Sequence, residues 1–133
     1  MLERLTTAWW GPSEDQSVSG LRPEELDATL DRLGVVARSR PFLVDIIGPD
    51  ENVLTIGVGR RETVLAFMTG TGDPPYLVSF SADHLVDESV WFDYAGAETE
   101  FGPDQVIAME AGRAVARSFA ATGELSGAEW AEA

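Results

Sequence analysis

Four short segments between Phe42 and Phe80 have the composition of β-strands, and only a few residues connect each segment to the next. Turn-forming residues such as Pro49-Asp50-Glu51-Asn52 separate them. Parallel neighbours need a crossover of about a dozen residues or more, so connections this short join antiparallel strands. The sequence therefore predicts an antiparallel meander formed by Phe42–Gly48, Val53–Arg60, Thr63–Gly70 and Tyr76–Phe80.

Two segments with helical spacing flank the meander. Pro23 suits the first position of a helix, and Leu26, Leu30 and Leu33 then recur at helical spacing, with Gly34 as the predicted end. The second helix is predicted to start at Gly102-Pro103-Asp104 and to end at Gly123. Its stripe consists of small and apolar side chains, namely Ile107, Ala111, Ala114, Val115, Ser118 and Phe119.

Further strands are predicted on both sides of the meander. Leu5–Trp10 precedes a polar turn at Gly11–Gln16, and because Trp9 and Trp10 are adjacent they should face opposite ways. In the segment "SVWFDYAG", Val90, Phe92 and Tyr94 alternate with Trp91 and Asp93, and Glu98–Phe101 follows a turn. The predicted fold is α+β, an antiparallel sheet of about five to seven strands with one or two helices packed on one face. Residues 1–133 are expected to form a single domain.

The charge of the chain is strongly negative. Twenty-three acidic residues face nine arginines, and there is no lysine. Ten acids lie between Arg61 and Arg113 with no arginine among them: Glu62, Asp73, Asp83, Asp87, Glu88, Asp93, Glu98, Glu100, Asp104 and Glu110. This balance disfavours binding to nucleic acid or to an anionic membrane. It fits either a surface kept in solution by its acids or a negative face that attracts a cationic partner.

The sequence contains none of the usual signals for export, membrane insertion or metal binding by thiolates. There is no cysteine, no apolar run of about 18 residues, and no basic segment followed by an apolar one at the start. We therefore expect a cytoplasmic protein without cofactor or metal.

Catalytic motifs are weak in this chain. His84 is the only histidine, and Asp83 and Ser81 lie too close to it in sequence to form a hydrolase triad among themselves. Glu98 and Glu100 share one strand face, as a glycosidase pair would, but loops this short leave little room for a sugar cleft. Gly57-Val58-Gly59 leads into another strand instead of a helix, which indicates close packing and not a nucleotide loop.

Several stretches resemble the Imm-one (Imm1) family of immunity proteins from bacterial polymorphic-toxin systems. The resemblance rests on "TTAWW", "PEELDATLDRL", "LTIGVG", "VWFDYAG" and the closing "AVARSFAATGELSGAEWAE". In the closing stretch Gly123 permits a reversal after the helix, and Ala128–Glu132 is expected to return as a short strand. Trp130 would then be buried against the helix, with Glu129 and Glu132 outside.

The resemblance implies a non-catalytic inhibitor that covers the active site or substrate groove of a cognate toxin, which in this family is often a nucleic-acid deaminase. We expect a monomer that forms a heterodimer with one toxin molecule and touches no nucleic acid or membrane itself. An acidic effector or secretion chaperone, and a small enzyme using His84 or Glu98 and Glu100, are the alternatives. The predicted contact residues combine aromatic and acidic side chains: Trp91, Asp93, Tyr94, Glu98 and Glu100, with Asp87 and Glu88 at the rim.

Overall fold

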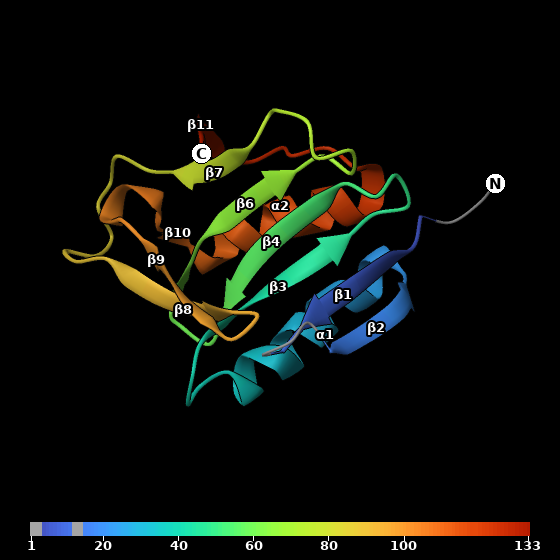
Figure 1. Cartoon of the computed structure of the whole chain (residues 1–133), viewed down its shortest axis with the longest axis horizontal. Helices are drawn as coiled ribbons and strands as arrows, with labels where there is room; N and C mark the ends of the chain where they lie inside the picture. The colour runs from blue at the N-terminus through green and yellow to red at the C-terminus, as the bar shows by residue number, and fades with distance from the viewer. Residues whose placement is uncertain (1–3, 12–14) are drawn as a thin grey trace.

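The computed structural model describes residues 4–11 and 15–133. These residues form two α-helices, α1 (Pro23–Val36) and α2 (Met109–Thr122), and a 3₁₀ turn at Pro103–Gln105. Their strands are β1 (Thr6–Trp10), β2 (Gln16–Leu21), β3 (Phe42–Ile47), β4 (Val53–Val58), β5 (Glu62–Thr63), β6 (Leu65–Met68), β7 (Leu77–Phe80), β8 (Val90–Tyr94), β9 (Ala97–Phe101), β10 (Ile107–Ala108) and β11 (Glu129–Glu132). The predicted α+β class is confirmed (Figure 1).

The main sheet has the strand order β11-β7-β6-β4-β3-β1-β2, and all neighbours along this path are antiparallel. Including β8 and β9, the described residues place nine strands in this sheet, more than the sequence predicts. The excess comes partly from β2, whose sequence "QSVSGL" lacks a strand's apolar alternation but pairs along β1. The predicted turn before β2 falls partly on residues 12–14, which lie outside the described residues.

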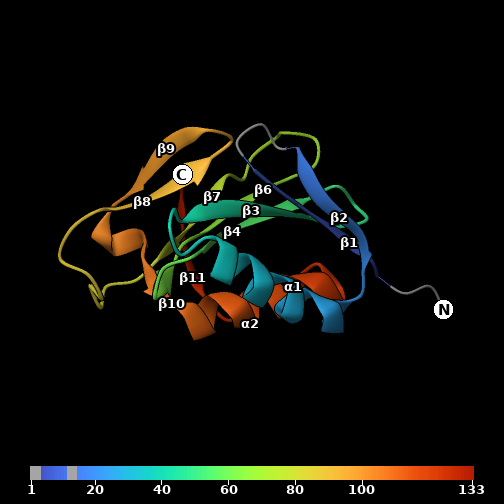
Figure 2. The same cartoon turned by 90° about the horizontal axis from the view of Figure 1, so that it is seen from below.

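Both helices cover one face of the sheet, as predicted (Figure 2). Alternate residues of β3 and β4 point toward them, so that Val44, Ile46, Leu54 and Ile56 are fully buried in one apolar cluster. Phe119 of α2 belongs to the same cluster. The period of two in the strands therefore places the main core between the sheet and the helices. Neither helix of the described residues is long and apolar enough to cross a membrane.

The hairpin β8–β9 covers one end of the other face of the sheet (Figure 2). Its Phe92 and Phe101 meet edge to face, with ring centroids 6.1 Å apart, and pack with Leu43, Val64 and other residues in a second apolar cluster. A single parallel pair, Phe42 with Asp93, joins β8 to the start of β3. The hairpin is thus attached at one end of the sheet, and no helix or strand of the described residues covers the remainder of this face (Figure 2).

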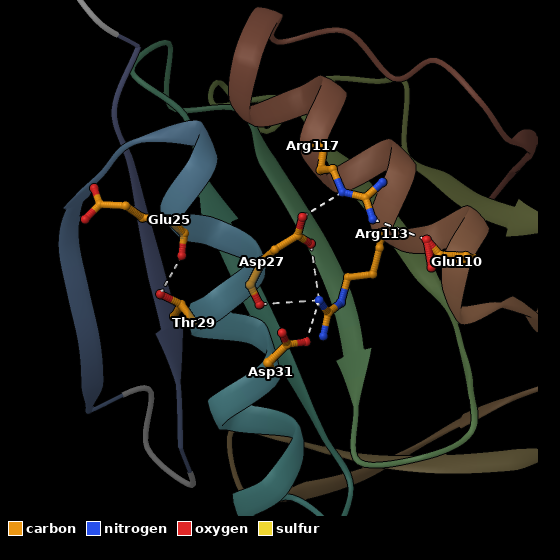
Figure 3. A network of polar contacts seen from close by, with 7 residues as sticks. All are labelled: Glu25, Asp27, Thr29, Asp31, Glu110, Arg113 and Arg117. Atoms are coloured by element: carbon orange, nitrogen blue, oxygen red, sulfur yellow. Dashed lines mark hydrogen bonds and ion pairs between the residues drawn. The ribbon is translucent and has the colours of Figure 1, made fainter.

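Ion pairs join α1 to α2 (Figure 3). Asp27 of α1 accepts hydrogen bonds from Arg113 at 3.2 Å and from Arg117 at 2.6 Å. Arg113 also pairs with Asp31 at 3.0 Å, and Arg117 with Glu110 at 3.3 Å. The hydrogen bond to Asp27, together with the attraction of its charge, raises the pKa of Arg117. The network holds the two helices side by side over the sheet.

Both helices depart from their predicted bounds. α1 continues through Gly34 to Val36, because its C-cap residue Ala37 is fully buried against the sheet. α2 begins at Met109 and not at Gly102-Pro103-Asp104, where only the 3₁₀ turn forms. Tertiary hydrogen bonds hold the intervening backbone extended: Ser79 Oγ donates to the Gln105 carbonyl at 2.7 Å, and Ile107 pairs with Thr63.

Three of the four tryptophans lie where the sequence places them. Trp9 is 36% exposed while Trp10 packs against the main core, so the two do face opposite ways. Trp130 lies in β11 and is partly buried against the same core, with Glu129 and Glu132 exposed on either side. β11 pairs with β7, which extends the sheet by one strand after α2. The prediction of a returning terminal strand is confirmed.

Two glycines, one in β4 and one in the turn after it, permit close contacts. A Cβ on Gly57 would lie 2.5 Å from the ring of Phe92, and a Cβ on Gly59 would lie 2.4 Å from the carbonyl oxygen of Ala37. Gly59 also has a φ of 100°, which side chains rarely adopt. The packing role predicted for this glycine pair is confirmed, since one accommodates the hairpin and the other the end of α1.

Candidate protein-binding surface

The register of the hairpin gathers four of the predicted contact residues on one face. Trp91 pairs with Glu100 and Asp93 with Glu98 across the two strands. Residues directly opposite each other in an antiparallel pair project from the same face. A two-residue turn at Ala95-Gly96, where both residues have positive φ, sets this register. Trp91, Glu98 and Glu100 are exposed, so the hairpin presents one indole beside two carboxylates.

Asp93 does not belong to the exposed part of this face. Its exposure is only 8%, and its Oδ1 accepts a hydrogen bond from Arg40 Nη2 at 3.1 Å. The backbone N–H of Asp93 also donates to the Pro41 carbonyl at 2.9 Å. Asp93 was predicted as a contact residue, but it is buried on the face that it shares with Trp91, because the pairing of β8 with the start of β3 brings Arg40 against the carboxylate.

Two arginines from outside the acidic stretch flank the hairpin. Arg60 donates from Nε and Nη2 to the carbonyl oxygen of Trp91, at 3.0 and 2.8 Å, and its guanidinium lies 5.4 Å from the centroid of the Phe92 ring. Together with Arg40 it lines a hollow of about 150 Å³ that Trp91 and Glu98 also border. The acidic segment between Arg61 and Arg113 contains no arginine, but the fold places Arg40 and Arg60 beside its hairpin. Both arginines hold the hairpin in position.

Most of the acidic residues on the hairpin, and in the loop before it, have no ion-pair partner among the described residues. Glu98 and Glu100 on β9 and Asp87 and Glu88 in the preceding loop are all exposed. None of the four makes an ion pair with another residue in the described ranges. Trp91, which lies on the same hairpin face as Glu98 and Glu100, is 43% exposed, so a large apolar side chain is in contact with solvent. These five residues combine an aromatic side chain with four uncompensated carboxylates, and we call them the hairpin surface.

Tyr94 lies on the opposite face of the hairpin. It alternates with Trp91 and Asp93 along β8, and its hydroxyl donates to Asp45 Oδ2 at 2.8 Å. Asp45 belongs to β3 and is itself only 8% exposed. No sequence motif predicts a role for Asp45, Arg40 or Arg60 in this region. For Asp45 a signal exists, since it is the one charged residue within the apolar strand "FLVDII".

Among the residues that the structure describes, His84, Asp83 and Ser81 do not form a hydrogen-bonded triad. His84 is exposed in the loop before β8, with a φ of 49°, and no hydrogen bond or ion pair joins it to any residue that the structure describes. The Asp83 N–H donates to Ser81 Oγ at 3.1 Å, which is an ordinary loop contact. Within residues 4–11 and 15–133, no three histidine, aspartate or glutamate side chains come together as they would around a metal ion.

Comparison with known proteins assigns the chain to a family. A search among curated proteins finds no similar sequence. The model of the family described as "Immunity protein Imm1" matches residues 15–130, which include both helices and the hairpin. The match covers most of the chain, and it agrees with the resemblance carried by the short motifs. This chain belongs to the Imm1 family of immunity proteins.

Proposed function

We propose that this protein inhibits a cognate toxin that acts on nucleic acid, namely a cytosine deaminase, by binding it through the hairpin surface. The observation that carries the proposal is the exposed Trp91 on one face with Glu98 and Glu100, which have no ion-pair partner among the described residues, on a chain that belongs to an immunity family. The inhibitor acts without catalysis, as a monomer that binds one toxin molecule in the cytoplasm of the producing cell. The choice of a deaminase rests on the family resemblance alone.

Complementary charge supports this choice of partner. A toxin that grips DNA or RNA needs a basic groove for the phosphates. The chain has a net charge of −14, and the hairpin surface carries four of its negative charges within two neighbouring segments. Attraction between such surfaces raises association rates to about 10⁸–10⁹ M⁻¹s⁻¹ at low salt. An inhibitor that docks over the basic groove also blocks the flipped or single-stranded base from the active site.

Charge alone does not supply the affinity that protection of the producing cell requires. A nanomolar complex needs about −12 kcal/mol. Exposed tryptophans are typical anchors of such interfaces, because they bury a large apolar area on binding. The two arginines that hold β8 in place reduce the ordering cost of binding, since the strand that carries Trp91 is already fixed to the sheet.

Co-expression tests the proposed function directly. The chain is co-expressed with the protein encoded immediately upstream of it, and growth of the cells is the readout. We expect the wild-type chain to restore growth and to co-purify with the toxin as a heterodimer of one copy each by light scattering. Continued killing of the cells, together with the absence of a complex, would refute the proposal.

A charge series tests whether the hairpin surface is the contact. Glu98→Gln and Glu100→Gln should slow association with the toxin and reduce its salt dependence, whereas Trp91→Ala should mainly speed dissociation. Glu24→Gln is the matched control, because Glu24 is exposed on α1, on the far side of the sheet, and its loss changes the net charge equally. If the control slows association as much as the hairpin variants do, only the net charge matters and the surface is misplaced.

A further inference from the structure

A second hollow lies on the face of the sheet that the helices leave uncovered. Strands β3, β4 and β6 form its floor, the hairpin forms one wall, and Tyr76 and Leu77 also border it. Its volume is about 340 Å³, near the lower end of the range for ligand pockets. The lining is largely apolar, including Leu43, Val53 and Met68. We call it the sheet groove.

Of the described side chains that line the sheet groove, Asp45 is the one that carries a charge. Its Oδ1 accepts a hydrogen bond from Thr55 Oγ1 at 2.6 Å, and its Oδ2 accepts one from Tyr94 at 2.8 Å. No arginine or histidine of the described residues pairs with it. A carboxylate has about four acceptor positions, so each oxygen of Asp45 keeps one position for a further donor.

The two most buried carboxylates in the described parts of the chain differ in whether a cationic side chain lies beside them. Asp93 and Asp45 are each 8% exposed. Asp93 has Arg40 at 3.1 Å, whereas the described residues offer Asp45 two neutral hydroxyl donors. A buried charge is costly unless it is paired with an opposite charge. The carboxylate of Asp45 is therefore largely withdrawn from water, and no cationic side chain of the described residues lies beside it.

We propose that Asp45 receives an arginine side chain of the toxin, inserted into the sheet groove. This inference rests on the proposed function, and it adds a specific contact on the opposite side of the hairpin. The apolar floor accommodates the methylene stem of an arginine, and the guanidinium fork matches the two carboxylate oxygens. Tyr76, which is 42% exposed, borders the groove and offers a ring on which a planar guanidinium can stack.

The same geometry favours arginine over other occupants. A lysine would supply the charge, but its ammonium cannot donate in parallel to both oxygens in the way that the planar guanidinium does. An anionic or purely apolar ligand would leave Asp45 without a counter-charge. A toxin that binds nucleic acid has basic side chains on its surface for phosphate contacts. A partner that holds the hairpin from both faces would meet the hairpin surface on one side and Asp45 on the other.

The experiment measures binding of the toxin domain to Asp45→Asn and to wild type. Asparagine keeps the shape of the side chain and an oxygen for one of the two hydroxyl donors, but it removes the charge. We expect the dissociation constant to rise about 30-fold or more, mainly through faster dissociation. The control is Glu24→Gln, which makes the same change in net charge on the helix side and should leave the constant within about twofold.

The outcomes separate this inference from the proposed function. If wild type binds the toxin and Asp45→Asn binds it equally well, the inference is wrong and the inhibitor function stands. If wild type neither binds nor protects, both fall. Because loss of an acceptor at Asp45 can also disturb folding, the wild-type chain is tested against toxin variants in which each surface arginine becomes glutamine. One of these should weaken binding about 30-fold or more, and a series without such a loss overturns the inference.

Discussion

Replacement of Gly57 by alanine should loosen the hairpin from the sheet. The new methyl carbon would lie 2.5 Å from Cε1 and 2.6 Å from Cζ of Phe92. Carbon atoms in contact normally lie about 3.5–4.0 Å apart, so the ring must retreat by about 1 Å. Phe92 is only 1% exposed and packs against Phe101, so it cannot retreat without moving β8.

The expected cost follows from two opposing effects. Overpacking of a tight core costs about 1–3 kcal/mol, and the upper half of that range applies to a contact this short. Alanine also restricts the unfolded chain more than glycine does, and this effect raises the free energy of unfolding by about 0.5–1 kcal/mol. Gly57→Ala should therefore lower the free energy of unfolding by about 1–2.5 kcal/mol. With a urea m-value of about 1–3 kcal/mol per molar, the unfolding midpoint should fall by about 1 M.

Urea unfolding of Gly57→Ala, with two further variants, checks this reasoning. Gly34→Ala is the control, because a Cβ at Gly34 meets nothing within 4 Å, and alanine in a helix interior should stabilise by about 0.5–1 kcal/mol. Phe92→Leu removes the ring atoms that the methyl group would touch, so Gly57→Ala should cost much less in that background. An undiminished cost in the Phe92→Leu background, or no cost beside the native ring, would refute the proposed clash.

Three other sets of substitutions test the helix pair, the terminal strand and the enzyme alternative. Asp27→Asn should cost about 1–2 kcal/mol, between the values for exposed and buried ion pairs, since its two arginine partners are 13% and 46% exposed. Asp31→Asn, at a 72% exposed site, should cost less than about 0.5 kcal/mol in the same urea titration, and equal costs would contradict the ranking. Trp130→Ala should cost about 3 kcal/mol, the low end of the range for a buried aromatic residue. Hydrogen exchange should then become fast along β11, and retained protection there would argue against the anchoring role. His84→Ala should leave protection against the toxin unchanged in the growth assay, whereas a loss of protection would favour the enzyme alternative.

The local pattern of the sequence was enough to predict the layers of this fold. Alternation in "VLTIGVG" identifies the face of β4 that meets the helices, because a strand turns successive side chains to opposite sides. The spacing of the leucines in α1 and the glycine at position 123 predict the helices and the final reversal in the same way. These features depend on neighbours within a few residues, which the sequence displays directly.

Contacts between distant segments were decided only by the tertiary structure. From the sequence pattern alone, Asp93 would be taken for an exposed strand residue. In the structure β8 pairs with β3, and this pairing brings Arg40, 53 residues away in the chain, against the carboxylate of Asp93. Asp45 and Tyr94 likewise meet across 49 residues, and this contact places a buried charge in the sheet groove. The sequence predicted which side chains lie on which face of a strand. Whether a charged side chain has an ion-pair partner depends on how strands far apart in sequence come together. The alternation of residues within a single strand carries no information about this long-range pairing.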